Sequence, residues 1–141
     1  RDFHCRNLLV CPDGKLGIID FQGAMHGPIT YDLVSLLRDC YIDNEENWIE
    51  KKVGNFQQSL VSEKFSYATV ESDEFIRWFD WVGLQRHLKC VGIFNRLNIR
   101  DGKPEYMREI PRVLNYLSTV LNRHPELKGI SHLLKDANIS N

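Results

Sequence analysis

The sequence lacks the features that mark several classes of protein. No apolar run reaches the roughly 18 residues that a membrane-spanning helix needs, and no signal-peptide hydrophobic region is visible. Lys and Arg together number 18 against 19 Asp and Glu, so the formal net charge is only -1. A chain balanced in this way has no general electrostatic attraction to nucleic acid or to an anionic membrane. We therefore expect neither as a partner.

Cysteine is sparse, and its spacing does not suit a metal or disulfide framework. The four cysteines form no Cys-x-x-Cys pair and do not stand at zinc-finger spacing from histidine. Without a secretory signal, we expect reduced thiols in a cytoplasmic protein. A glycine-rich phosphate-binding loop is also missing, because Gly14 and Gly17 belong to a predicted hairpin.

The length and the apolar patterns predict a fold of the α+β class that is mostly helical. A chain of 141 residues suits one domain, which we expect to cover residues 1–141. Two apolar runs, 7–11 and 16–19, flank the turn residues Pro12-Asp13-Gly14-Lys15 and predict a β-hairpin. Further along, apolar residues recur at three- and four-residue spacing. They predict a helical bundle, with helices over 33–40, 43–62, 72–97, 105–109, 111–122 and 130–135.

Polar residues stand at the outer ends of the predicted hairpin. Asp2 comes before its first strand, Asn7 begins that strand, and Asp20 follows the second strand. Because a hairpin brings its two ends together, Asn7 and Asp20 should lie side by side, with Asp2 on the loop just before them. Mg²⁺ prefers one or two carboxylates, a neutral oxygen and substrate phosphates. The pattern predicts a magnesium site beside a base, although polar residues on a purely structural ribbon are the alternative.

This arrangement resembles the catalytic loop and metal-binding element of the protein-kinase-like superfamily. Asp-x-x-x-x-Asn is followed by a strand and then by Ile19-Asp20-Phe21. The resemblance implies that Asp2 accepts the proton of the attacking hydroxyl and that Asn7 and Asp20 bind Mg²⁺, with ATP as the phosphoryl donor. The next helix begins within about a dozen residues of Asp20, which leaves no room for a protein kinase activation segment. The substrate should therefore be a small molecule.

His4 and Tyr31-Asp32-Leu33 make the chain similar to the aminoglycoside-phosphotransferase and choline-kinase family. The resemblance implies that Asp32 and His4 brace the catalytic loop, although Asp32 could be an ordinary helix-start carboxylate. Segments 19–28, 78–89, 100–103 and 110–113 further resemble bacterial cell-wall sugar kinases. Those enzymes phosphorylate the anomeric hydroxyl of N-acetylmuramate and N-acetylglucosamine in peptidoglycan recycling.

The helix predicted around residues 78–89 carries most of the candidate substrate-binding residues. These candidates are Trp78, Trp81, Gln85, Arg86 and, in the loop after Asp20, His26. The two tryptophans and Gln85 share a helix face, and with Asp80 they form a plausible sugar-binding surface. The fork of Arg86 suits the carboxylate of N-acetylmuramate. The alternative is that the tryptophans belong to the core and that Arg86 forms a surface ion pair.

The resemblance also implies parts that this sequence does not contain. A phosphate-covering loop and a lysine paired with a glutamate would lie on an amino-terminal lobe, so we expect this chain to be the carboxyl-terminal lobe and inactive alone. The expected partners are that lobe, a nucleotide and a sugar. Two alternatives stay open: an aminoglycoside or choline-type phosphotransferase, and a non-catalytic kinase-like binding module. Residues 77–89 carry more basic than acidic side chains, which favours an anionic or neutral sugar over a polycationic antibiotic.

Overall fold

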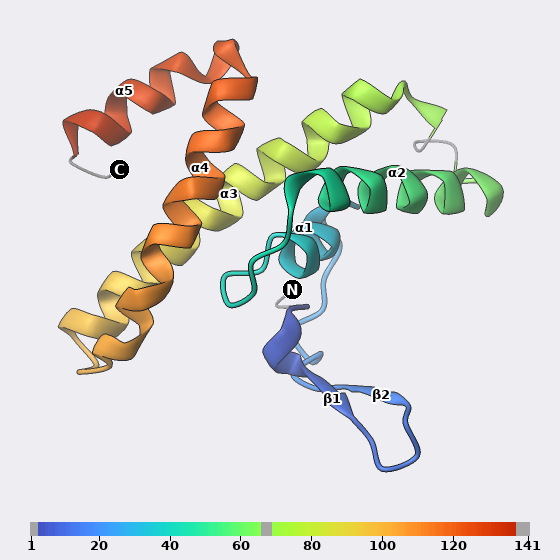
Figure 1. Cartoon of the computed structure of the whole chain (residues 1–141), viewed down its shortest axis with the longest axis horizontal. Helices are drawn as coiled ribbons and strands as arrows, with labels where there is room; N and C mark the ends of the chain where they lie inside the picture. The colour runs from blue at the N-terminus through green and yellow to red at the C-terminus, as the bar shows by residue number, and fades with distance from the viewer. Residues whose placement is uncertain (1–2, 66–68, 138–141) are drawn as a thin grey trace. The chain divides into compact units, whose positions relative to one another are not determined.

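The structure, a computed structural model, describes residues 3–65 and 69–137 and has the expected mostly helical α+β class. It begins with a 3-10 helix η1 (Cys5–Asn7) and the strands β1 (Leu8–Val10) and β2 (Leu16–Ile18). The remaining elements are α1 (Tyr31–Leu37), α2 (Glu46–Ser62), α3 (Ser72–Ile99), η3 (Pro104–Glu109), α4 (Ile110–Arg123), η4 (Pro125–Leu127) and α5 (Lys128–Asp136), as Figure 1 shows. In the described ranges, no helix is long and apolar enough to cross a membrane.

The chain divides into two compact units, Arg1–Val82 and Gly83–Asn141, and helix α3 contributes to both of them. The single domain expected over residues 1–141 stays a prediction. The predicted helices correspond closely to those of the structure, but α1 is shorter than its apolar pattern suggests. It ends at Leu37, so Cys40 is buried beyond the helix rather than on its face.

The hairpin has the register that its turn chemistry predicts. Strands β1 and β2 pair antiparallel, with Leu8 opposite Ile18 and Val10 opposite Leu16. In the turn, the Cys11 N–H donates to the Lys15 carbonyl at 2.8 Å. Gly14 has a φ of +78°, a conformation that glycine adopts without steric cost. This register places the residue before β1 and the residue after β2 at the same end of the ribbon.

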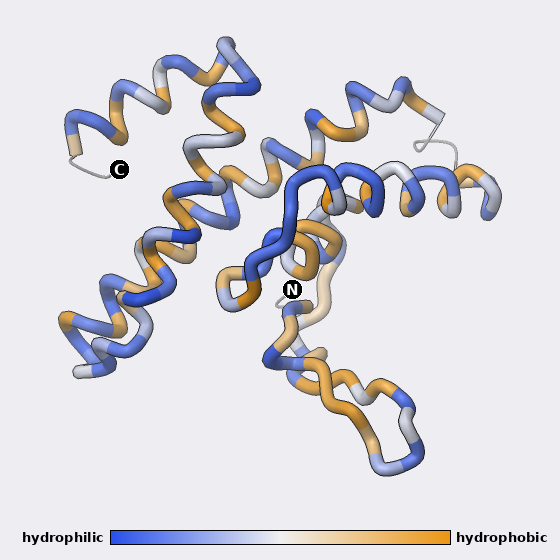
Figure 2. Tube along the Cα trace, viewed as in Figure 1, coloured by the Kyte–Doolittle hydropathy of each residue, from blue (hydrophilic) through white to orange (hydrophobic). Residues whose placement is uncertain are grey.

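The apolar core of the first unit is built from three helices. Helix α1 provides Val34 and Leu37, α2 provides Ile49 and Val53, and α3 provides Phe75 and Phe79. Each pair is spaced by three or four residues, which places both members on one helix face. Figure 2 shows the matching alternation of apolar and polar segments along α2 and α3. Full burial of such a side chain stabilises a fold by roughly 1.5–3 kcal/mol relative to exposure.

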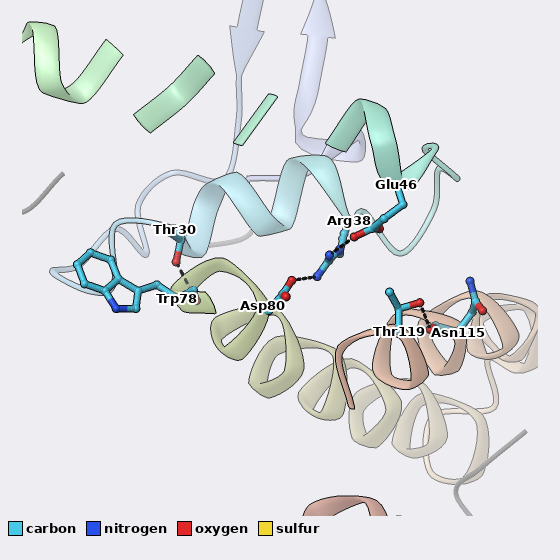
Figure 3. A network of polar contacts seen from close by, with 7 residues as sticks. All are labelled: Thr30, Arg38, Glu46, Trp78, Asp80, Asn115 and Thr119. Atoms are coloured by element: carbon cyan, nitrogen blue, oxygen red, sulfur yellow. Dashed lines mark hydrogen bonds and ion pairs between the residues drawn. The ribbon is translucent and has the colours of Figure 1, made fainter. Parts of the chain in front are cut away.

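A charged side chain is buried beside this core. Arg38, directly after α1, is 0% exposed, and its guanidinium donates to Asp80 Oδ1 at 2.7 Å and also to Glu46 Oε1. Figure 3 shows this network. The guanidinium also lies 4.8 Å from the ring centroid of Phe79. Because a buried charge is tolerated only when it is paired and hydrogen-bonded, Arg38 ties the end of α1 to α2 and to the first part of α3.

The second unit contains a buried carboxylate as well as ring contacts. The His87 and Tyr116 rings stack with centroids 5.0 Å apart. Glu109, at the end of η3, accepts hydrogen bonds from Arg112 at 2.7 Å and from Arg108 at 3.0 Å. Burial by itself would raise the pKa of Glu109, but the hydrogen bonds from the two guanidinium groups lower it overall. In this part of the chain, too, a buried charge lies against opposite charges, those of Arg108 and Arg112.

We expect Arg38→Met to lower the free energy of unfolding by about 3–5 kcal/mol, because the variant leaves Asp80 buried without its cation. Urea denaturation of the full-length protein, followed by tryptophan fluorescence, measures this loss. Lys15→Met is the control, since the pair between Lys15 and Asp13 is exposed to solvent and should contribute little to the free energy of unfolding. Equal effects of the two substitutions would contradict the role given to Arg38.

Candidate functional site

The open end of the hairpin brings together the two residues predicted to bind metal. The Ile19 N–H donates to the Asn7 carbonyl at 3.0 Å, one step beyond the last strand pair, and Asp20 is the next residue. Asn7 and Asp20 therefore meet at one end of the ribbon, the geometry that the sequence predicts. Asp2, the predicted base, lies outside the described residues. The chemical roles of all three stay predictions.

Asp20 has a backbone conformation that is uncommon for its residue type. Its φ is +58°, in the left-handed region, which costs most non-glycine residues roughly 1–2 kcal/mol and which Asp and Asn tolerate best. Such conformations are enriched at functional sites. The side chain is exposed, and Oδ1 accepts a hydrogen bond from Gln22 Nε2 at 2.7 Å. Gln22 therefore orients a carboxylate that remains accessible, a role that the sequence analysis did not assign to it.

The loop before β1 is held by a residue that sequence reasoning missed. Asp39 is fully buried, and its carboxylate accepts hydrogen bonds from the Cys5 N–H at 2.8 Å and the Tyr41 N–H at 2.9 Å. The Tyr41 ring then contacts His4 edge-on, with ring centroids 5.5 Å apart. Its face lies 3.5 Å from the guanidinium carbon of Arg6. Residues 39–41 thus fix η1 and, through it, the approach to Asn7.

The two residues predicted to brace this loop occupy different positions. The His4 carbonyl accepts the Asn7 N–H at 2.9 Å, so His4 contributes to the loop through its backbone as well as through its ring contact with Tyr41. Asp32 is the second residue of α1, is exposed, and lines a cavity together with His26. The bracing roles of His4 and Asp32 both stay predictions.

The loop between Asp20 and α1 lines two cavities within the first unit. One has a volume of about 510 Å³ and lies between Gly27–Thr30 and the α3 residues Trp78, Trp81 and Val82. The other has a volume of about 350 Å³ and is lined by Met25 to Ile29 together with Tyr31 and Asp32. The structure therefore brings both candidate tryptophans next to the loop that follows Asp20, and it places His26 on the same loop.

The candidate substrate-binding residues differ in exposure. Trp78 is half-buried and its Nε1 donates to Glu74 at 2.7 Å, whereas Trp81 is 39% exposed. Gln85 and Arg86 belong to the second unit, where Gln85 is exposed and Arg86 is only 4% exposed. The substrate-binding roles of all these residues stay predictions.

One interpretation of the sugar-binding surface is wrong. Asp80 was expected on that surface, but it is 0% exposed and accepts a hydrogen bond from Arg38. The Asp80 side chain faces the core rather than solvent, and its carboxylate forms the buried ion pair with Arg38. The α3 surface near the loop is thus formed by tryptophan rings rather than by this carboxylate.

The donor atoms at the hairpin end suit a hard divalent cation. An amide oxygen from Asn7 and an accessible carboxylate from Asp20 are ligands that Mg²⁺ accepts, and it commonly completes its shell with water and substrate phosphates. Among the described residues, no group of three or more His, Cys, Asp or Glu side chains could hold a metal by itself. Asn7 and Asp20 would supply two ligands to a metal at this end, and water or substrate phosphates commonly supply others.

The phosphotransferase class that the hairpin motif indicates is also found by comparison. Residues 1–70 match the model of the APH family, described as the phosphotransferase enzyme family. The chain belongs to this family, which confirms the resemblance drawn from its motifs.

Several curated relatives that match most of this chain share one name. The N-acetylmuramate/N-acetylglucosamine kinase of Neisseria meningitidis serogroup B is 49% identical over 140 residues, which cover 95% of this chain and 40% of that protein. The proteins of the same name from Pseudomonas aeruginosa and Caulobacter vibrioides are 38% and 31% identical, over 95% and 83% of this chain and 39% and 31% of their own lengths. The chain thus spans two fifths or less of these relatives.

The Cys5 thiol provides a probe of the loop. Burial, followed by the hydrogen bond and the negative charge of Asp39, raises the pKa of Cys5 to about 11. We therefore expect slow alkylation of Cys5 by iodoacetamide at pH 9, where little thiolate is present. Asp39→Asn should accelerate it by removing the negative charge. Peptide mass spectrometry measures both rates, with Cys11 as internal control; equal acceleration at Cys11 would instead indicate general unfolding.

Proposed function

We propose that the protein containing this chain transfers a phosphoryl group from ATP, with Mg²⁺, to a hydroxyl of a small amino sugar of the N-acetylmuramate or N-acetylglucosamine type. The family match and the names of the relatives support this substrate class. In the cell, the enzyme would act in the cytoplasm, in peptidoglycan recycling. The nucleotide-covering lobe would be supplied by the rest of the same protein.

The observation that carries the proposal is the meeting of Asn7 and Asp20 at the open end of the hairpin. Asp20 holds an accessible carboxylate in a left-handed conformation, and Gln22 orients it. A metal ligand needs a fixed direction, and the backbone conformation of Asp20 together with the Gln22 hydrogen bond gives its carboxylate one. This geometry favours the phosphotransferase over a binding module without catalytic activity.

The residues have distinct tasks in the proposed reaction. Phosphoryl transfer depends mainly on positioning and on neutralisation of charge. Asn7 and Asp20 would hold Mg²⁺, which neutralises charge on the phosphates when bound. Asp2 would accept the proton of the sugar hydroxyl, and the segment 39–41 fixes the loop on which Asp2 and Asn7 stand.

The acceptor is proposed to bind beside the loop that leads from Asp20 to α1. Only residues 21–30 separate Asp20 from the helix, so a long peptide has no platform there. The cavity of about 510 Å³ beside Trp78 and Trp81 has the size of a small-molecule site. Aromatic rings suit the apolar face of a pyranose, and His26 lies on the same loop.

We expect Asp20→Asn to lower kcat/KM for the amino sugar at least about 100-fold, because it removes a metal ligand's charge while keeping a residue that tolerates the left-handed backbone. A coupled assay of ADP release by the full-length protein measures this loss. Asp13→Asn is the matched control, since Asp13 is an exposed carboxylate in the turn at the other end of the hairpin. An equal loss in both variants would contradict the assignment.

The predicted base has its own test. Asp2→Asn should lower kcat by roughly 10²–10⁴-fold with little change in KM, since a general base acts on the transition state. Rates are measured with N-acetylmuramate, N-acetylglucosamine, choline and kanamycin. Turnover of choline or kanamycin alone would instead support the alternative phosphotransferases, and no magnesium-dependent turnover of any of the four would favour the binding module.

A further inference from the structure

The first turns of α3 carry a cluster that joins a cation to an aromatic ring. Oε1 of Glu74 accepts the hydrogen bond from Trp78 Nε1 at 2.7 Å, and Oε2 lies 3.6 Å from Arg77 Nη1. The guanidinium carbon of Arg77 lies 4.6 Å from the centroid of the Trp81 ring. Glu74 thus fixes the indole on one side and restrains the guanidinium on the other.

Helix geometry places Trp81 between the other two side chains. At roughly 100° per residue, Arg77 and Trp78 point about 100° apart, and Trp81 falls about 40° from Arg77 and about 60° from Trp78. On the Trp78 side, Trp81 lines the cavity of about 510 Å³ that borders Gly27–Thr30. On the other side, Arg77 lies over its ring. A ligand against Trp81 would therefore have a guanidinium at its edge.

The two sugars in the relatives' names differ by one charged group. N-acetylmuramate carries a lactyl ether that ends in a carboxylate, and N-acetylglucosamine has a hydroxyl in its place. Arginine binds carboxylates with a planar pair of N–H donors, and its flat face stacks on aromatic rings. Recognition of the larger sugar therefore calls for an accessible arginine beside an aromatic surface.

Resting on the proposed function, we propose that Arg77 binds the carboxylate of the acidic sugar while Trp81 contacts the apolar face of the same sugar. The Arg77 side chain is 43% exposed and is held beside Trp81. Arg86, the arginine that sequence reasoning favoured, is only 4% exposed, and Arg38 is committed to the buried pair with Asp80. Arg77 is therefore the specificity residue for the acidic substrate.

The test compares the two sugars in the full-length protein. Arg77→Gln should lower kcat/KM for N-acetylmuramate about 10- to 100-fold, mainly through KM, because it removes a charge-assisted contact made already on binding. The value for N-acetylglucosamine should fall by no more than about threefold. Arg77→Lys should give an intermediate loss for the acidic sugar, since lysine keeps the charge without the planar fork.

The matched control is Lys52→Gln. Lys52 lies 5.4 Å from the Trp48 ring centroid on α2, a comparable cation–aromatic pair away from the cavity, so both sugars should be unaffected. An equal fall for both sugars in Arg77→Gln, or no fall for N-acetylmuramate, would overturn the proposal. If the wild type phosphorylates neither sugar, the proposed function fails separately. Calorimetric binding of each sugar then decides: Arg77-dependent binding of only the acidic sugar supports the assignment, and its absence refutes it.

Discussion

The buried guanidinium of Arg38 is the constraint on which the first unit depends. A charge that leaves water needs partners, and Arg38 finds them in Asp80, in Glu46 and on the face of Phe79. These partners come from two further helices, so the ion pairs form only when α1, α2 and α3 adopt one particular arrangement. Apolar contacts such as that of Val34 with its neighbours favour compactness, and the directional bonds of Arg38 select among compact states.

Residues 38–41, directly after α1, connect this arrangement of helices with the candidate site. Asp39 follows Arg38 directly, and its carboxylate accepts the Cys5 N–H, while Tyr41 contacts both His4 and Arg6. The hairpin itself has strands of only three residues, and an isolated ribbon of that size is marginal in water. The position of Asn7 therefore depends less on the ribbon than on the buried segment after α1, through the hydrogen bond from the Cys5 N–H to the Asp39 carboxylate.

The features that sequence reasoning predicted are those with local causes. Asp13-Gly14 between two apolar runs predicts the hairpin, and the hairpin alone predicts that Asn7 and Asp20 meet. The missed features are contacts between distant residues. Asp39 and Cys5 are separated by 34 positions, and Arg38 and Asp80 by 42, so no spacing rule reveals either pair. Polar residues in a helical pattern suggest an exposed face, which is why Asp80 was misinterpreted: burial of a polar residue is visible only once its partner is known.

The loop 21–30 links the two halves of the candidate site. The loop begins directly after Asp20, whose backbone is left-handed, and the Gln22 side chain donates a hydrogen bond to the Asp20 carboxylate. Its last residues form one wall of the cavity whose other wall carries Trp78 and Trp81. The Thr30 hydroxyl donates to the Trp78 carbonyl at 3.4 Å, which anchors the end of the loop to α3 (Figure 3). Only residues 21–30 connect Asp20 with the cavity. The same short loop therefore determines both the position of Asp20 and the space available beside it. In the proposed reaction, the short loop would restrict the acceptor to a small molecule, whereas side chains on α3 would recognise its charge.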